Sequence, residues 1–248
     1  MPFGIGVHIL VAICFAVHAF RTGQDRYWLF ILFMFPFLGS VVYAIVVWLP
    51  EMRGSRGARQ VASGVRRILD PNRELREARD QLDMAATPNN RLRLAEALLE
   101  AGQPAEAIAL YQAVLSGVYA HDPHITVRMA HALLDAGRAP EARQALDDLI
   151  REKPDFKSPE GHLVYARAVA AMGDREKAHE EFDVLVGYYA GLEARARYAE
   201  ILLGWGERER AKPLVEESMK IAGRMPAHSR KMNSKWLAVL KKVQGQLG

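Results

Sequence analysis

The sequence predicts an all-α protein in which an N-terminal helical hairpin precedes a solenoid of about four helix pairs with flanking capping helices. Two observations support this fold class. The first 49 residues are almost entirely apolar, and nearly all the charge follows them. The remainder repeats with a period near 34, a size typical of stacked helix–turn–helix units. The period is visible in glycines spaced 35, 36 and 33 residues apart: Gly102, Gly137, Gly173 and Gly206.

Charge divides the chain into three parts. Residues 1–67 carry seven arginines against two acidic residues, 68–223 carry 20 basic against 27 acidic residues, and 224–248 carry six basic residues and no acidic one. An acidic body therefore lies between two basic ends. The single cysteine, Cys14, rules out a disulfide within the chain and a thiolate metal site.

We predict a hairpin at 1–50, a flexible basic linker at 51–69, a lead-in helix at 70–86, a repeat array at 87–224 and a C-terminal basic capping helix at 225–248.

The two apolar runs, residues 3–20 and 27–49, are each about long enough to cross a bilayer as a helix, which takes roughly 17–25 residues. Pro36 is expected to kink the second helix. Arginines are more numerous after the second run than between the runs, so the positive-inside rule places both termini in the cytoplasm. The sequence thus predicts a multi-pass protein of a bacterial inner membrane. A cleaved signal peptide over the first run and a hairpin buried in a globular core are the alternatives.

The hairpin carries a family resemblance. Trp28, Leu29, the turn Pro36-Phe37-Leu38-Gly39 and Tyr43 resemble the transmembrane hairpin that precedes the catalytic region in cardiolipin synthases of the phospholipase D superfamily. That superfamily needs a His-x-Lys motif, and no histidine here is followed two residues later by lysine. The resemblance implies an anchor without phosphodiesterase activity.

The predicted linker is rich in glycine, serine and arginine, a composition that favours a flexible chain. Its arginines are expected to act as a topology signal and to contact anionic lipid at the bilayer surface. Nucleic acid is not expected as a partner, because no aromatic residues are interleaved and the body behind is acidic. The predicted membrane-surface residues are Arg53, Arg56, Arg59, Arg66 and Arg67.

The array begins with two proline-led helices. Asp70-Pro71 predicts a lead-in helix over about 71–85, and Thr87-Pro88 opens the first repeat by the same N-cap logic. Each recurring glycine is expected at the turn between helix A and helix B of a unit, where a positive φ suits glycine. Alanines recur seven residues before and five residues after it, where the two helices should cross: Ala95, Ala130, Ala166 and Ala199, then Ala107, Ala142, Ala178 and Ala211.

These positions, with Leu94, Leu98, Tyr111 and Val114 in the first unit, resemble tetratricopeptide repeats over about residues 88–224. The fourth unit departs from the pattern at Ser218 and Pro213, as terminal repeats often do. A last helix over about 229–246 is expected to cover its exposed edge. The stripe that would do so is Met232, Trp236, Leu240, Val243 and Leu247.

The tetratricopeptide resemblance implies that a protein or peptide binds the concave face lined by the A helices. An acidic and apolar groove favours a basic and apolar partner. The Lys/Asn/Arg set by which chaperone-binding members hold a C-terminal carboxylate is missing, and the alternative is that these are ordinary solvated positions. The candidate groove residues are Asn89, Leu92, Glu96, Leu99, Glu100, His124, Val127, His131, Leu134, Asp135, Glu160, Leu163, Arg167, Ala170, Glu193, Ala196, Glu200 and Leu203.

No catalytic constellation is present in the sequence. His121-Asp122-Pro123-His124 has no companion cluster that would make it a metal site, and neither a nucleophile elbow nor a phosphate-binding glycine loop occurs. We therefore expect no enzyme activity, cofactor, metal or small-molecule substrate.

The predicted function is a membrane-anchored scaffold or adaptor, and the whole chain resembles a little-characterised bacterial group that joins such a hairpin to divergent repeats. The alternatives are an accessory subunit of a membrane enzyme in phospholipid or envelope synthesis, contacted through the hairpin, and an enzyme with an unrecognised site.

Overall fold

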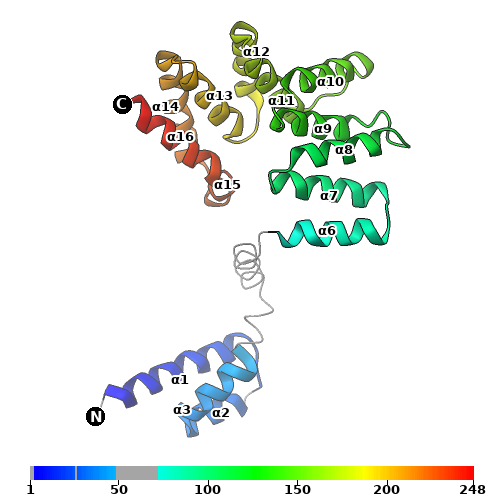
Figure 1. The fold of residues 1–248 in the computed structure, drawn as a ribbon. Coiled ribbons are helices and arrows are strands. Elements are labelled where there is room, and N and C mark those ends of the chain that lie inside the picture. Colours follow the sequence, from blue (N-terminus) through cyan, green and yellow to red (C-terminus); the bar gives the residue numbers. More distant parts are fainter. Residues whose placement is uncertain (1–2, 26, 49–71) are drawn as a thin grey trace. The chain divides into compact units, whose positions relative to one another are not determined.

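The computed structural model describes residues 3–25, 27–48 and 72–248, with the side chains of 3–10 and 36 outside this description. The chain divides into two compact units, Met1–Arg73 and Glu74–Gly248. The described residues form helices, turns and loops, with no strand among them (Figure 1). The predicted membrane-surface residues all lie outside the described ranges: Arg53, Arg56, Arg59, Arg66 and Arg67.

The first unit contains more than two helices. Helix α1 spans Phe3–Arg21, but the second apolar run forms α2 (Tyr27–Met34), α3 (Pro36–Tyr43) and a π-helical turn η1 (Ala44–Trp48). Proline has no N–H to donate to the preceding helical turn. Phe35, the residue before Pro36, has φ −133° and ψ 71°, and this backbone conformation interrupts the helix.

The bend at Phe35 brings backbone against backbone. A Cβ placed on Gly39 would lie 2.7 Å from the carbonyl oxygen of Ile31, so only glycine fits there. Trp28, Leu32 and Tyr43 are buried in the small core of this unit.

The predicted location in the membrane is wrong. Among the described residues, no helix combines the length and apolar character needed to cross a bilayer. We expected 27–49 to form one kinked helix, whereas the break before Pro36 leaves two helices of eight residues each.

The second unit is a stack of antiparallel helices (Figure 1). Each A helix packs against its own B helix, and each B helix of the first three pairs packs against the A helix of the next pair. This is the predicted α-solenoid of four helix pairs, α7–α14, with one helix before and two after. The helices are α6 (Arg73–Met84), α7 (Pro88–Glu100), α8 (Pro104–Leu115), α9 (Pro123–Asp135), α10 (Ala139–Glu152), α11 (Pro159–Ala171), α12 (Arg175–Tyr188), α13 (Glu193–Gly204), α14 (Arg208–Arg224), α15 (Ala227–Met232) and α16 (Ser234–Leu247).

The first three A helices begin in the same way. Thr87, Asp122 and Ser158 are their N-caps, and each side chain accepts a hydrogen bond from a backbone N–H of the first turn. A proline follows each cap at the first helical position, where its missing N–H costs nothing. The helix start predicted at Thr87-Pro88 is confirmed. The fourth A helix lacks such a cap, and Leu192 N instead donates to Asn233 Oδ1 at 2.8 Å.

The recurring glycines end the A helices as predicted, with φ between 72° and 84°. At three of the turns the residue after the glycine donates to the carbonyl five residues before it, as Gln103 N does to Leu98 O at 2.8 Å. The glycine N–H itself bonds the carbonyl three residues back, 3.0 Å in Gly102 and Gly137. These two hydrogen bonds form a Schellman motif, which satisfies the last carbonyl groups of helix A and directs the chain into helix B.

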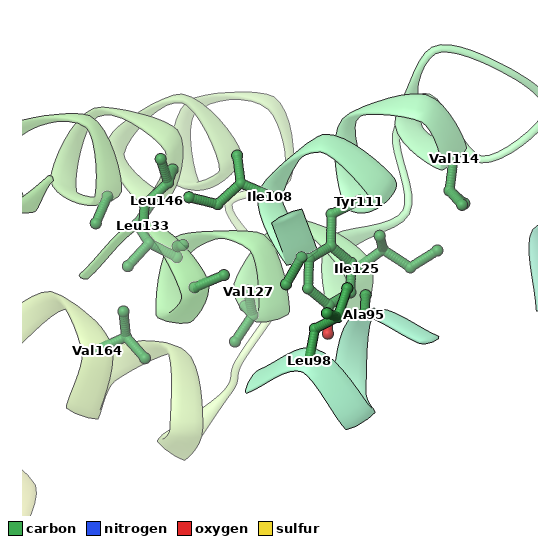
Figure 2. Packing of buried hydrophobic residues seen from close by; sticks show 14 of the residues in the cluster. Ala95, Leu98, Ile108, Tyr111, Val114, Ile125, Val127, Leu133, Leu146 and Val164 are labelled. Carbon is green, nitrogen blue, oxygen red and sulfur yellow. The ribbon is translucent and has the colours of Figure 1, made fainter. Parts of the chain in front are cut away.

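The recurring alanines lie at the helix crossings, and all eight have 0% exposure. Larger apolar side chains fill the space around them. Figure 2 shows Tyr111 of α8 directed toward Leu98 and Ala95 of α7, with Ile108, Leu133 and Leu146 grouped on the other side of the same cluster. Because this cluster runs from α6 to α11 without interruption, each unit completes its core only against its neighbour.

The C-terminal helices close the stack. Leu240 and Val243 of α16 are buried against α13 and α14, whereas Met232 is 72% exposed. Ser218, where the pattern expects an apolar residue, is fully buried, and its hydroxyl donates to Leu214 O at 2.6 Å. The departure from the repeat pattern is thus accommodated by a local hydrogen bond.

A pair of glycine substitutions tests the turn geometry. Gly173→Ala places a Cβ at φ 84° and should lower the free energy of unfolding by about 1–2 kcal/mol in urea denaturation. Gly187→Ala is the control, because Gly187 lies inside α12 with no heavy atom within 4 Å of the added Cβ, and it should raise stability by about 0.5–1 kcal/mol. Equal losses from both changes would contradict the assignment.

A second pair tests a buried hydroxyl. Tyr111 is fully buried, and its hydroxyl has no hydrogen-bond partner in the part of the chain that the structure describes; burial, with the charge of Glu96, raises its pKa to about 12. Tyr111→Phe should raise the free energy of unfolding by about 1 kcal/mol, because an unsatisfied polar atom leaves the core. Tyr198→Phe should lower it by about 1 kcal/mol, because the Tyr198 hydroxyl donates to Asp183 and contacts His179. Denaturant melts of both variants check the opposite signs.

Candidate functional site

One row of the candidate groove residues packs between helices. Leu92 is partly buried against the core, and the equivalent residues of the other units belong to the core: Val127 and Leu163 are 8% and 4% exposed, and Ala196 is fully buried. Gly161 sits directly against this row, since a Cβ there would approach Val127 Cγ2 to 3.1 Å. Side chains in this row hold neighbouring units together and do not offer a surface to a partner.

The other candidate positions reach the surface of the A helices. Leu99, Leu134 and Leu203 are partly buried, and Ala170 is buried. Arg167, His131 and Glu193 are also partly buried. The exposed members are Asn89, Glu96, Glu100, His124, Asp135, Glu160 and Glu200.

Some of the carboxylates on this face are paired with arginines. Glu96 of α7 pairs with Arg128 of α9, and Asp135 of α9 accepts a hydrogen bond from Arg167 of α11 at 3.2 Å. The repeat offsets could have located Arg128, because Arg93, Arg128 and Arg197 occupy equivalent positions in their units. The sequence reading included Arg167 but missed Arg128. The face is therefore mixed in charge and not simply acidic.

Three successive A helices form a hollow of about 420 Å³ on this face. It brings together four candidates, Leu134, Arg167, Ala170 and Glu200, and adds residues that the sequence reading missed. Arg197 and Trp205 are the most informative of the added residues, since one is charged and the other is a large aromatic. The complete lining is Leu134 of α9, Arg167, Ala170 and Ala171 of α11, and Arg197, Glu200, Ile201, Gly204 and Trp205 of α13 and its C-cap.

The charges in and around the hollow influence one another. Burial, and then the charge of nearby Arg197, lowers the pKa of Arg167. Burial also lowers the pKa of His131 against the opposing pull of Asp135, so the imidazole is neutral at pH 7. The guanidinium of Arg197 lies over the ring of Trp236 in α16, 4.6 Å from its centroid, and its buried Nε has no hydrogen-bond partner among the described residues.

Polar clusters elsewhere tie helices together. His162 contacts the Tyr188 hydroxyl at 2.5 Å and Glu181 at 2.6 Å, and His179 contacts the Tyr198 hydroxyl at 2.9 Å. His124 packs edge-on against Phe156. Within the described ranges, no group of three or more His, Cys, Asp or Glu side chains is placed to hold a metal ion.

Comparison with known proteins gives a family match within the array: residues 98–164 match the tetratricopeptide repeat model. A thermophilic TPR protein of Thermus thermophilus has a similar structure, with 17% identity, a TM-score of 0.52, and coverage of 67% of this chain and 88% of that one. A kinesin light chain of Podosopora anserina with nearly identical TPR-like repeats aligns with 20% identity and a TM-score of 0.48, covering 64% of this chain and 86% of that one. The search of curated proteins found no match.

These matches concern the repeats. They do not support the resemblance of the N-terminal hairpin to cardiolipin synthases, which rested on short apolar motifs. The matched segment runs from the end of α7 into the first half of α11 and so includes Leu134 of the hollow. The second unit therefore has the fold of tetratricopeptide solenoids.

Proposed function

We propose that the chain is a protein-binding scaffold or adaptor that holds an extended segment of a partner along the A helices. The observation that supports this most directly is the hollow between α9, α11 and α13. Its walls combine apolar surface from Leu134, Ile201 and Trp205 with the charged groups of Arg167 and Arg197.

The size and lining of the hollow suit recognition of a few side chains. A volume of about 420 Å³ lies within the range of about 300–1,000 Å³ found for ligand sites. Apolar walls supply affinity, while a small number of polar groups fix the orientation of what is bound. Neither an imidazole nor a hydroxyl or thiol nucleophile lines the hollow, so its chemistry fits binding better than bond cleavage.

Site-specific photocrosslinking tests the scaffold. A crosslinker at Leu134 should capture a defined partner in cells that express the chain natively, and one at Leu99 should capture the same partner if the segment extends along the array. Ile150 on helix α10 is the control position, being 57% exposed and outside the hollow. Mass spectrometry of the adducts checks the result. Capture of the same proteins at Ile150 as at Leu134 would count against a binding face on the A helices.

A second candidate function involves the first unit, which exposes large apolar side chains. Phe20 and Phe33 are 80% and 83% exposed, and Phe30 is 66% exposed. Apolar patches of this kind usually mark an interaction site. This observation favours an accessory subunit that contacts another protein through the first unit.

Replacing residues 1–50 with an unrelated helical hairpin separates the two functions. If the first unit contacts the partner, co-purification of the complex should be lost while the array keeps its helical circular dichroism. If the array alone binds, the complex should survive the exchange. A complex of unchanged yield would therefore contradict the second candidate.

A further inference from the structure

We infer that the hollow between α9, α11 and α13 binds an acidic side chain, Asp or Glu, that has an apolar neighbour in an extended segment of the partner. This inference rests on the proposed scaffold function and adds the chemistry of the bound residue. It replaces the expected basic partner, because two of the acidic groove residues that suggested that partner, Glu96 and Asp135, are already paired with arginines.

The donors for a carboxylate are in place and incompletely used. The buried Nε of Arg197 has no hydrogen-bond partner among the described residues, and Glu193 Oε1 lies 3.8 Å from it. Arg167 gives one hydrogen bond, to Asp135, although its side chain is only 15% exposed. A guanidinium carries five N–H donors, and a carboxylate can accept two of them in parallel. An incoming carboxylate would therefore satisfy donors that the protein leaves open.

Trp236 positions one of these donors. Trp236 belongs to the C-terminal helix α16, and its ring centroid lies 4.6 Å from the guanidinium carbon of Arg197. A cation–π contact of this kind holds a guanidinium in place without using its N–H groups. The α16 helix thus does more than close the stack. Trp236 is a positioning residue that acts through Arg197.

The remaining walls select the neighbours of the acidic residue. Leu134, Ile201 and Trp205 offer an apolar surface for an adjacent side chain. Glu200 borders the same hollow and disfavours any carboxylate that Arg167 or Arg197 does not hold, so a single acidic residue fits better than an acidic run. The A-helix face continues through α9 to α7, which allows a chain to pass along it and favours an internal acidic residue over a C-terminal carboxylate.

The probe is a displayed library of short random segments with linkers on both sides, so that no terminal carboxylate is present. Selected on the full chain, it should enrich Asp or Glu beside Leu, Ile or Phe. The best segment is then synthesised with an amidated C-terminus, once with its acidic residue and once with the matching amide. Fluorescence anisotropy should show about tenfold weaker binding of the amide peptide, since a charge-assisted hydrogen bond is lost.

Variants of the protein complete a double-mutant cycle. Arg197→Gln should weaken the acidic peptide about tenfold and remove the difference between the two peptides. Arg151→Gln is the matched control, an arginine on α10 that is 72% exposed and pairs with Asp148 outside the hollow, and it should change nothing. Trp236→Leu should weaken the acidic peptide, and Trp236→Phe should restore most of the affinity. Thermal melts confirm that each variant is folded.

Other outcomes decide between the two proposals. Equal binding of the acidic and amide peptides, or enrichment of basic segments, overturns the inference. The scaffold function still stands in that case if Leu134→Asp abolishes binding of the selected segment. A library that yields no binding segment at all overturns the inference and counts against peptide binding by the A helices as well.

Discussion

The array depends on the close crossing of its helices. Eight alanines with no exposed surface lie where A and B helices meet, four on each side of the recurring glycines. A methyl group there permits an approach that a larger side chain would prevent, and the interlocked larger residues, such as Tyr111 and Phe182, then pack to the density of a protein interior. The glycine turns make these crossings possible, because a positive φ of 72° to 84° brings helix B back along helix A.

The same stacking creates the candidate site. The A helices of successive units lie side by side, so residues at the same position in each unit form a row across the array. Charged side chains of different units therefore become neighbours. Arg128 reaches Glu96 of the preceding unit, and Arg167 reaches Asp135. These pairs are at least partly solvent-exposed and individually contribute little to stability. They matter because they decide which carboxylates remain available to a partner.

The end of the array contributes to the site as well as closing the stack. Asn233 accepts the hydrogen bond of Leu192 N at the start of the fourth A helix, and Trp236 lies under Arg197. Both contacts come from the C-terminal helices and reach the fourth A helix. A segment that the repeat pattern would assign only to covering an exposed edge is therefore also in contact with the helix that carries part of the candidate site.

The sequence by itself determined the repeat, because a fixed period with glycine and alanine at set offsets constrains local backbone geometry. It therefore predicted the helix pairs, the positive φ of Gly102 and its equivalents, and the cap at Thr87. Hydropathy and spacing could not show that the second apolar run breaks at Phe35, and the membrane location inferred from it was wrong. Only the tertiary structure decided that Val127 and Leu163 are core residues and that Arg197 meets Arg167 in one hollow. These features depend on how one unit is rotated against the next, which is set by packing between units and not by the pattern within any one of them.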